Sequence, residues 1–206
     1  MIESVIFDLG GVILNIDYQK TIDQFKSLGI SDFNKNYSQF NQSDLFDLFE
    51  TGQISEADFF SKLQDGDPKI CKTSLMDAWN AMLLDLPKER WDFLLALKEQ
   101  LPIVLLSNTN ETHVTALNKL LPEETSLNKL KSLFKNAYFS NEIGLRKPEK
   151  ETFEWVLKQN NFKAETTLFI DDSIQHIEGA KSIGIKTWHL DKGSILDLDT
   201  ALQAHH

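Results

Sequence analysis

The stretch VIFDLGGVIL, residues 5–14, begins as an apolar run and continues into a loop with two glycines. Its β-branched and aromatic residues predict a short buried strand. Asp8 comes directly after that run, and Gly10 and Gly11 give the following loop the backbone freedom for a sharp bend. The strand therefore delivers one carboxylate to a tight loop. Two interpretations are open at this point: a structural aspartate or a nucleophile.

The second half of the chain alternates between short apolar runs and helical patterns. Such alternation is typical of a parallel sheet covered by helices. We therefore predict an α/β fold with a doubly wound parallel sheet. The further strands are expected over residues 102–108, 136–140, 167–172 and 185–190, and the helices over 111–121, 148–160 with Pro148 at its first position, and 173–184.

The chain between the first strand and the alternating part has a helical pattern and is rich in aromatic residues. We predict a core domain made of residues 1–15 and 87–206, with residues 16–86 inserted as a helical cap. A small helical bundle needs its own apolar core. Most of the following aromatic residues are expected to form that core, with one or two lining a substrate pocket: Phe25, Phe33, Tyr37, Phe40, Phe46, Phe49, Phe59, Phe60 and Trp79.

The bulk composition narrows the class of protein. The chain has 206 residues and a formal net charge of −10, so it offers no basic surplus for a nucleic acid or an anionic membrane. An anionic substrate remains compatible with a small cationic site. The start carries no recognisable secretory signal, and the single Cys71 cannot form an intramolecular disulfide, so we expect a cytoplasmic protein.

Polar residues stand where four predicted elements meet their loops. Asp8, Ser107, Asp171 and Asp172 lie at the carboxyl ends of predicted strands, and Lys147 precedes a predicted helix. The carboxyl ends of parallel strands share one edge of the sheet, where ligands bind in such folds. We therefore expect these side chains to converge.

The adjacent acids of FIDDS, Asp171 and Asp172, allow two interpretations. Either one is exposed and the other caps the next helix, or both join Asp8 in a site for a hard cation such as Mg²⁺. Two unit charges about 4 Å apart repel by roughly 4 kcal/mol at an effective dielectric near 20. A divalent cation removes that penalty and makes the pocket receptive to a phosphoryl group, so charge favours the metal site.

Ser107 and Lys147 are less informative when each is considered alone. Ser107 suits a donor to a phosphoryl oxygen, together with backbone amides at a helix start, but it also suits a simple helix cap. Lys147 stands in LRKPEK, where most lysines are solvated surface charges. Its functional interpretation comes only from its expected neighbours.

Four segments, FDLGG, LSN, RKPE and FIDDS, in this order resemble the four motifs of the haloacid dehalogenase superfamily. The longer stretches that surround them are most similar to its first subfamily of phosphatases, and there to bacterial glucose-1-phosphate phosphatase-like members. The resemblance implies a Rossmann-like core with an inserted helical cap. It also implies a Mg²⁺-dependent phosphoric monoester hydrolase acting on a small phosphorylated metabolite, with a sugar phosphate favoured. We expect the protein to be a monomer or weak dimer.

The resemblance assigns Asp8 as the nucleophile that forms an aspartyl-phosphate. It implies that Mg²⁺ binds Asp8, the backbone carbonyl of Gly10 and the acids of the fourth motif. Of these acids, Asp172 is expected to be a direct ligand, and Asp171 a ligand either directly or through water.

The resemblance also assigns the groups that hold the phosphate. Lys147 is expected to orient Asp8 and to neutralise the transferred group. Ser107, with backbone amides near Leu9 and Asn108, is expected to hold the phosphoryl oxygens.

The sequence departs from the family pattern at Gly10, where the usual motif has a second aspartate as general acid and base. Such a group contributes typically about 10² to 10⁴ in rate. Three functions stay open: a phosphatase for good leaving groups, a 2-haloacid dehalogenase, or a weakly active binding protein. The acid pair of FIDDS counts against the metal-free dehalogenase. Asp17 is a candidate substitute acid, although a helix cap before Tyr18 is the favoured interpretation. His113 and His176 are expected to face solvent.

Overall fold

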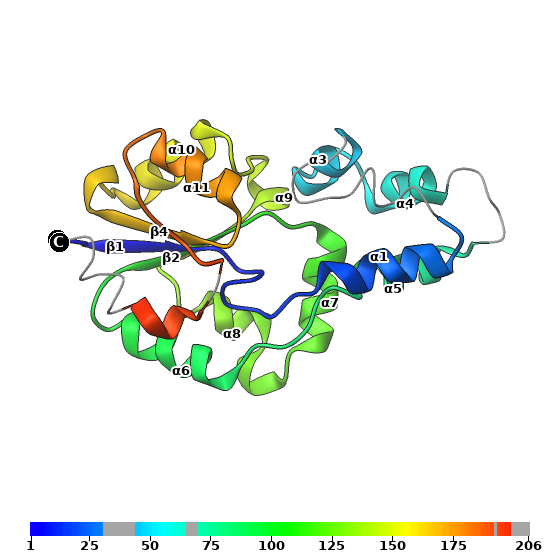
Figure 1. Ribbon diagram of the computed structural model, residues 1–206, viewed down its shortest axis with the longest axis horizontal. Coiled ribbons are helices and arrows are strands. Elements are labelled where there is room, and N and C mark those ends of the chain that lie inside the picture. The colour runs from blue at the N-terminus through cyan, green and yellow to red at the C-terminus, as the bar shows by residue number, and fades with distance from the viewer. Residues whose placement is uncertain (31–43, 65–69, 192, 199–206) are drawn as a thin grey trace.

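The computed structural model describes residues 1–30, 44–64, 70–191 and 193–198. Its five-stranded sheet has the order β3-β2-β1-β4-β5, and every neighbouring pair is parallel (Figure 1). The strands are β1 (Ser4–Phe7), β2 (Ile103–Ser107), β3 (Asn136–Phe139), β4 (Thr167–Asp171) and β5 (Lys186–His189). This confirms the predicted doubly wound sheet. The order reverses at the central β1, which is where such folds bind ligands.

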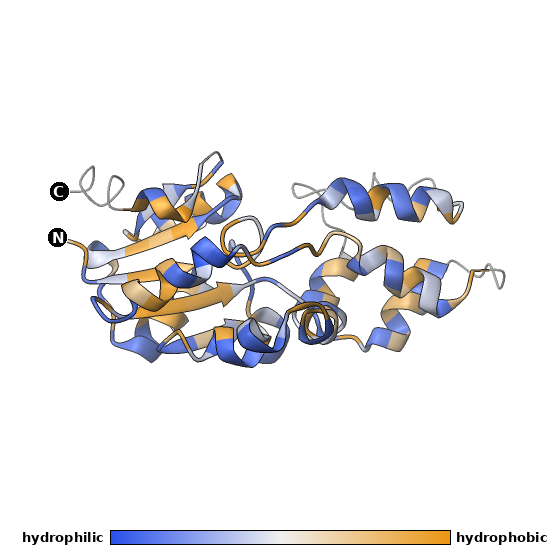
Figure 2. Ribbon diagram, turned by 90° about the horizontal axis from the view of Figure 1, so that it is seen from below, coloured by the Kyte–Doolittle hydropathy of each residue, from blue (hydrophilic) through white to orange (hydrophobic). Residues whose placement is uncertain are grey.

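Both faces of the sheet are buried under helices. On β1, Val5 and Phe7 pack into one apolar cluster and Ile6 into another on the opposite face, as the two-residue period of a strand requires. Figure 2 shows the apolar strands between helix layers. The core helices are α6 (Lys88–Leu97), α7 (Glu111–Leu120) and α8 (Leu127–Lys131) on one face, α10 (Lys150–Asn160) and α11 (Ile174–Lys181) on the other, and the short α9 (Ser140–Ile143) after β3.

Short 3₁₀ helices complete the described connections, at Glu123–Thr125, Ala164–Thr166 and Ile195–Asp197. None of the helices in the described part of the chain is both long and apolar enough to cross a membrane.

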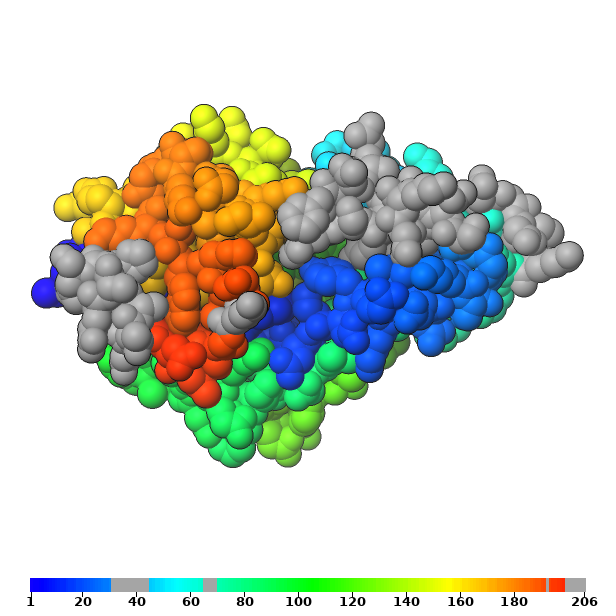
Figure 3. Space-filling model, viewed as in Figure 1, coloured from blue at the N-terminus to red at the C-terminus, as the bar shows by residue number. Residues whose placement is uncertain are grey.

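In the described part of the chain, four helices form a lobe beside the core (Figures 1 and 3). They are α1 (Tyr18–Ser27), α3 (Asp44–Glu50), α4 (Glu56–Gln64) and α5 (Lys72–Asn80). The lobe has an apolar cluster of its own, which confirms the expected aromatic core. Its aromatic members are Phe25, Phe46, Phe49, Phe59, Phe60 and Trp79, whereas Phe33, Tyr37 and Phe40 lie outside the described residues.

The two segments that join the lobe to the core run antiparallel and form a bridge. The Asp17 amide donates to the Met82 carbonyl at 2.9 Å, and the Leu84 amide donates to the Asn15 carbonyl at 3.1 Å. The chain therefore enters and leaves the lobe at one place, where these two segments are hydrogen-bonded to each other. We propose on this basis that residues 16–86 form the inserted cap.

Asp17 is the N-cap of α1, and its side chain accepts a hydrogen bond from the Gln19 amide at 3.0 Å. This confirms the helix-cap interpretation of Asp17. The carboxylate is occupied at the start of the cap and does not line the pocket described below.

Candidate active site

The carboxyl ends of β1, β2 and β4 meet at one edge of the sheet. Asp8 follows β1, Ser107 ends β2, and Asp171 ends β4 with Asp172 next in the chain. One carboxylate oxygen from each of Asp8, Asp171 and Asp172 lies within 4.8 Å of the others. The acids thus lie together as the strand ends led us to expect, while their chemical roles stay predictions.

Lys147 joins two of these acids. Its side chain is fully buried, and its Nζ donates to Asp8 Oδ1 at 2.6 Å and to Asp171 Oδ2 at 2.7 Å. Burial alone disfavours the charged amine, but the carboxylates of Asp171 and Asp8 outweigh it and raise the pKa of Lys147. Lys147 is therefore a permanent cation at the base of the site rather than a solvated surface lysine.

Asn108 holds the loop that carries Lys147. The Asn108 side chain accepts from the Lys147 amide at 2.9 Å and donates to the Lys147 carbonyl at 2.8 Å. These two bonds fix the backbone at Lys147, where the chain makes a turn before α10. The prediction of a helix beginning at Pro148 was therefore wrong by two residues, because α10 begins at Lys150. The sequence pattern predicted a role only for the backbone amide near Asn108, and this function of the Asn108 side chain was missed.

Asp171 is satisfied by protein groups at both carboxylate oxygens. Its Oδ1 accepts from the Ser173 amide at 2.8 Å, and its Oδ2 accepts from Lys147. His176 Nδ1 lies 2.9 Å from Oδ1 and 3.0 Å from Oδ2. Burial disfavours the ionised form of Asp171, but the combined effect of Lys147 and His176 is larger and lowers the pKa of Asp171 to about 2.

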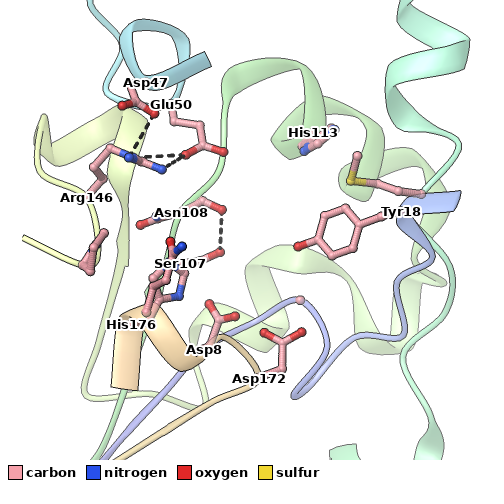
Figure 4. Close-up of a pocket in the computed structure, with 14 residues that line it drawn as sticks. Asp8, Tyr18, Asp47, Glu50, Ser107, Asn108, His113, Arg146, Asp172 and His176 are labelled. Atoms are coloured by element: carbon pink, nitrogen blue, oxygen red, sulfur yellow. Dashed lines mark hydrogen bonds and ion pairs between the residues drawn. The ribbon is translucent and has the colours of Figure 1, made fainter. Parts of the chain in front are cut away.

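The expectation that His176 faces solvent was wrong. Its side chain is only 17% exposed, and it points into the pocket toward the acids (Figure 4). The residue lies in the first turn of α11, and helical side chains lean toward the helix N-terminus. This places His176 beside Asp171 at the end of β4, and that geometry is the signal in the sequence that could have found it.

Asp172 is the acid of the FIDDS pair that lines the pocket. Burial, followed by the charges of Asp8 and Asp171, raises its pKa to about 7. Gly11, with a φ of +75°, lets the loop after β1 approach this carboxylate, because a Cβ at Gly11 would lie 2.2 Å from Asp172 Oδ2. The available donors are carboxylate oxygens, and the negative charge of Asp172 is destabilised by its neighbours. Such a site fits a hard divalent cation, which binds oxygen and offsets that charge.

The remaining predicted positions lie at the end of β2 and in the loop after β1. Ser107 is 3% exposed and lines the pocket together with Gly10 and Asn108. Leu9 buries its side chain in the core, and its carbonyl accepts from the Leu14 amide at 2.8 Å, which closes the loop. The side chain of Leu9 therefore does not line the pocket, and the expected role of the backbone near Leu9 stays a prediction.

The pocket above these groups has a volume of about 260 Å³ and is walled by both core and cap. The cap supplies Tyr18, Asp47, Glu50 and Met82, and the core supplies Arg146 among others. Figure 4 shows Tyr18 directing its ring toward the pocket from the side opposite Arg146. Among the residues that the structure describes, none of the aromatic residues expected as pocket candidates lines the pocket. Tyr18 was missed as a pocket residue because its place at the start of a predicted helix gave no sign that its ring faces the site.

His113 also differs from expectation, since it is 8% exposed and stacks on Trp79 of the cap with ring centroids 5.0 Å apart. Its Nε2 donates to the Trp79 carbonyl at 3.2 Å, and its Nδ1 accepts from Asn110 Nδ2 at 3.2 Å. Burial lowers the pKa of His113 to about 4. It is a neutral residue of the cap–core junction.

The family model of haloacid dehalogenase-like hydrolases matches residues 2–184, which include all of the site residues described above. The chain belongs to this family. The finer resemblance to glucose-1-phosphate phosphatase-like members stays a prediction.

Several relatives cover nearly the whole chain. A D-ribitol-5-phosphate phosphatase from Bacteroides thetaiotaomicron is 30% identical over 94% of this chain and 94% of its own. A sesquiterpene phosphatase from Aspergillus oryzae is 28% identical over 91% of this chain and 89% of its own. Among solved structures, an HAD family enzyme from B. thetaiotaomicron in complex with magnesium and inorganic phosphate is 31% identical, with a TM-score of 0.80, over 92% of this chain and 94% of that chain.

Gly10 is where this haloacid dehalogenase-like hydrolase departs from the usual family motif. A Cβ at Gly10 would lie 3.2 Å from Cδ1 of Ile16, at the entry to the cap. Any larger side chain there requires Ile16 to shift. The glycine therefore permits close packing between the loop after β1 and the segment that leads into the cap.

Proposed function

We propose that this protein is a Mg²⁺-dependent phosphatase that hydrolyses a small phosphorylated polyol or sugar through an aspartyl-phosphate on Asp8. The observation that carries the proposal is the buried Lys147 bridging Asp8 and Asp171, with Asp172 beside them. A nucleophilic carboxylate, a fixed cation and a further acid converge at the strand ends. Phosphoryl transfer requires mainly such placement and charge compensation.

In the proposed reaction, Asp8 forms a bond to phosphorus while the bond to the ester oxygen breaks, and the leaving oxygen takes up a proton and departs as an alcohol. Water then attacks phosphorus and gives up a proton, which releases inorganic phosphate and regenerates the carboxylate. Lys147 holds Asp8 in place and offsets negative charge, while Ser107 and backbone amides near Leu9 and Asn108 hold the phosphoryl oxygens. A magnesium ion, when bound, supplies further positive charge against the phosphoryl group.

We assign the metal to Asp8, Asp172 and the backbone carbonyl of Gly10. Asp171 is the weaker candidate for a direct ligand, because Lys147, His176 and the Ser173 amide already occupy its oxygens. In our proposal it reaches the ion through water and keeps Lys147 oriented. This refines the two possibilities left open for Asp171.

A polyol or sugar fits the pocket better than a terpene. Its wall contains carboxylates, Arg146, Asn108 and Tyr18, which suit a leaving group rich in hydroxyls. The related D-ribitol-5-phosphate phosphatase supports the same class of substrate. The cytoplasmic location, the monomeric or weakly dimeric state and the absence of nucleic-acid partners stay predictions.

Turnover with and without metal tests this proposal. We expect hydrolysis of para-nitrophenyl phosphate and of a pentitol phosphate in Mg²⁺, and loss of both activities in a chelator. The reason is that Asp8 and Asp172 together repel a phosphate dianion unless a cation lies between them. Phosphate affinity without turnover in Mg²⁺ would instead indicate the alternative of a catalytically weak binding protein.

Mg²⁺ binding should also displace a proton at mildly acidic pH. Asp172 has a pKa of about 7 in the metal-free protein, so at pH 6 it is mostly protonated and must ionise to bind a cation. We expect release of about one proton per Mg²⁺ at pH 6 and close to none at pH 8.5. Isothermal titration calorimetry in two buffers of different ionisation enthalpy measures this; equal enthalpies at pH 6 would contradict it.

A further inference from the structure

A charged cluster of three residues, two from the cap and one from the core, lines part of the pocket. Asp47 and Glu50 lie one turn apart on α3, and both bind Arg146 from the loop that precedes Lys147. Arg146 Nη1 lies 2.9 Å from Asp47 Oδ1, and Arg146 Nη2 lies 3.0 Å from Glu50 Oε2. All three residues line the same pocket as Asp8.

The cluster stands where the leaving group of the ester must lie. In Figure 4 the carboxylates of Asp8 and Asp172 are at one end of the pocket, and Asp47, Glu50 and Arg146 gather at the other, with Ser107 between them. A phosphoryl group in line with Asp8 therefore directs the rest of its ester toward the cap. The cluster meets that part of the molecule rather than the reacting phosphorus.

The formal charge of the cluster is one negative unit, because two carboxylates oppose one guanidinium. The side chains of Glu50 and Arg146 are only 11% and 16% exposed, so water screens them poorly. An anionic leaving group meets net repulsion and must displace a carboxylate to reach Arg146. A neutral polyol instead donates its hydroxyls to the carboxylate oxygens.

We propose that Asp47, Glu50 and Arg146 act as a charge filter that admits uncharged polyol leaving groups and rejects those with a second phosphate or a carboxylate. The inference rests on the proposed phosphatase function and specifies its substrates. The filter joins cap and core, so the selection requires both parts of the molecule. Repulsion of the wrong substrate is as much a source of specificity as attraction of the right one.

Two substrates that differ in one terminal group test the filter: ribitol 5-phosphate, which ends in a hydroxymethyl group, and ribonate 5-phosphate, which ends in a carboxylate. We expect the wild type to prefer the polyol by at least about tenfold in kcat/KM. Variants then change the cluster charge in single steps. Arg146→Gln makes it more negative, Glu50→Gln makes it neutral, and Glu50→Gln with Asp47→Asn makes it positive.

The preference for the polyol should rise in Arg146→Gln, fall several-fold in Glu50→Gln and invert in the double variant. Asp77→Asn removes one negative charge from an exposed position on α5 away from the pocket, and it should leave the preference unchanged. Because the preference is a ratio measured on one sample, partial unfolding of a variant cancels.

The outcomes separate this inference from the function on which it rests. Hydrolysis of ribitol 5-phosphate with a preference that does not follow the cluster charge would overturn the filter alone. Failure of the wild type to hydrolyse either ester or para-nitrophenyl phosphate would overturn the phosphatase, and the filter with it.

Discussion

Asp8→Asn should reduce turnover by a factor on the order of 10⁴ to 10⁶, comparable to the loss of a nucleophile in other enzymes. The amide cannot form an aspartyl-phosphate, although it preserves the size of the side chain. The fold should survive, because Lys147 keeps its ion pair with Asp171 at 2.7 Å. Burial raises the pKa of Asp8, so its charge is unfavourable in the metal-free protein. We therefore expect Asp8→Asn to melt at the same or a higher temperature without Mg²⁺.

Reduction with borohydride during turnover gives a direct measurement of the proposed intermediate. It should convert phosphorylated Asp8 to homoserine in the wild type, detected by peptide mass spectrometry, and give no such product in Asp8→Asn. Asp17→Asn is a matched control, because asparagine also caps helices. The Asp17→Asn variant should retain turnover within about threefold of the wild type. A decrease in turnover of about 10²-fold or more would instead indicate that Asp17 is the substitute acid.

The part of the site formed by strand ends was predictable from the sequence. Asp8, Ser107 and Asp171 each end or follow an apolar run, and parallel strands bring such positions to one edge whatever the loops do. The sheet followed from the same alternation of strands and helices. Because the local sequence pattern agrees with the global fold at these positions, they could be predicted without knowledge of long-range contacts.

The groups that tune the site were not predictable in this way. The contact of His176 with Asp171 depends on the orientation of the first turn of α11, and the clamp of Asn108 on Lys147 joins residues 39 positions apart. The ion pair between Glu50 and Arg146 spans 96 positions. Contacts of this kind depend on how loops and cap pack against the core, which periodicity does not encode.

Lys147→Met should combine a large loss of activity with a large loss of stability. Methionine matches the unbranched shape of lysine but leaves Asp8 and Asp171 buried without their shared cation. Removing one partner from a buried ion pair costs about 3–5 kcal/mol. We expect that decrease in the free energy of unfolding near pH 7, measured with urea in the absence of Mg²⁺, and a drop in turnover of about 10³-fold.

The stability loss in Lys147→Met should shrink on acidification, which distinguishes lost charge compensation from poor packing. In the wild type the pKa of Asp171 is lowered to about 2, so its ionised form stabilises the fold above its ordinary pKa near 4. The variant loses this stabilisation, and because burial without Lys147 raises the pKa of Asp171, a further penalty grows as pH rises above 4. Lys150→Met, at an exposed position on α10, should change neither property. A destabilisation equal at pH 4.5 and pH 7.5 would mean that Lys147 fills space rather than neutralising the acids.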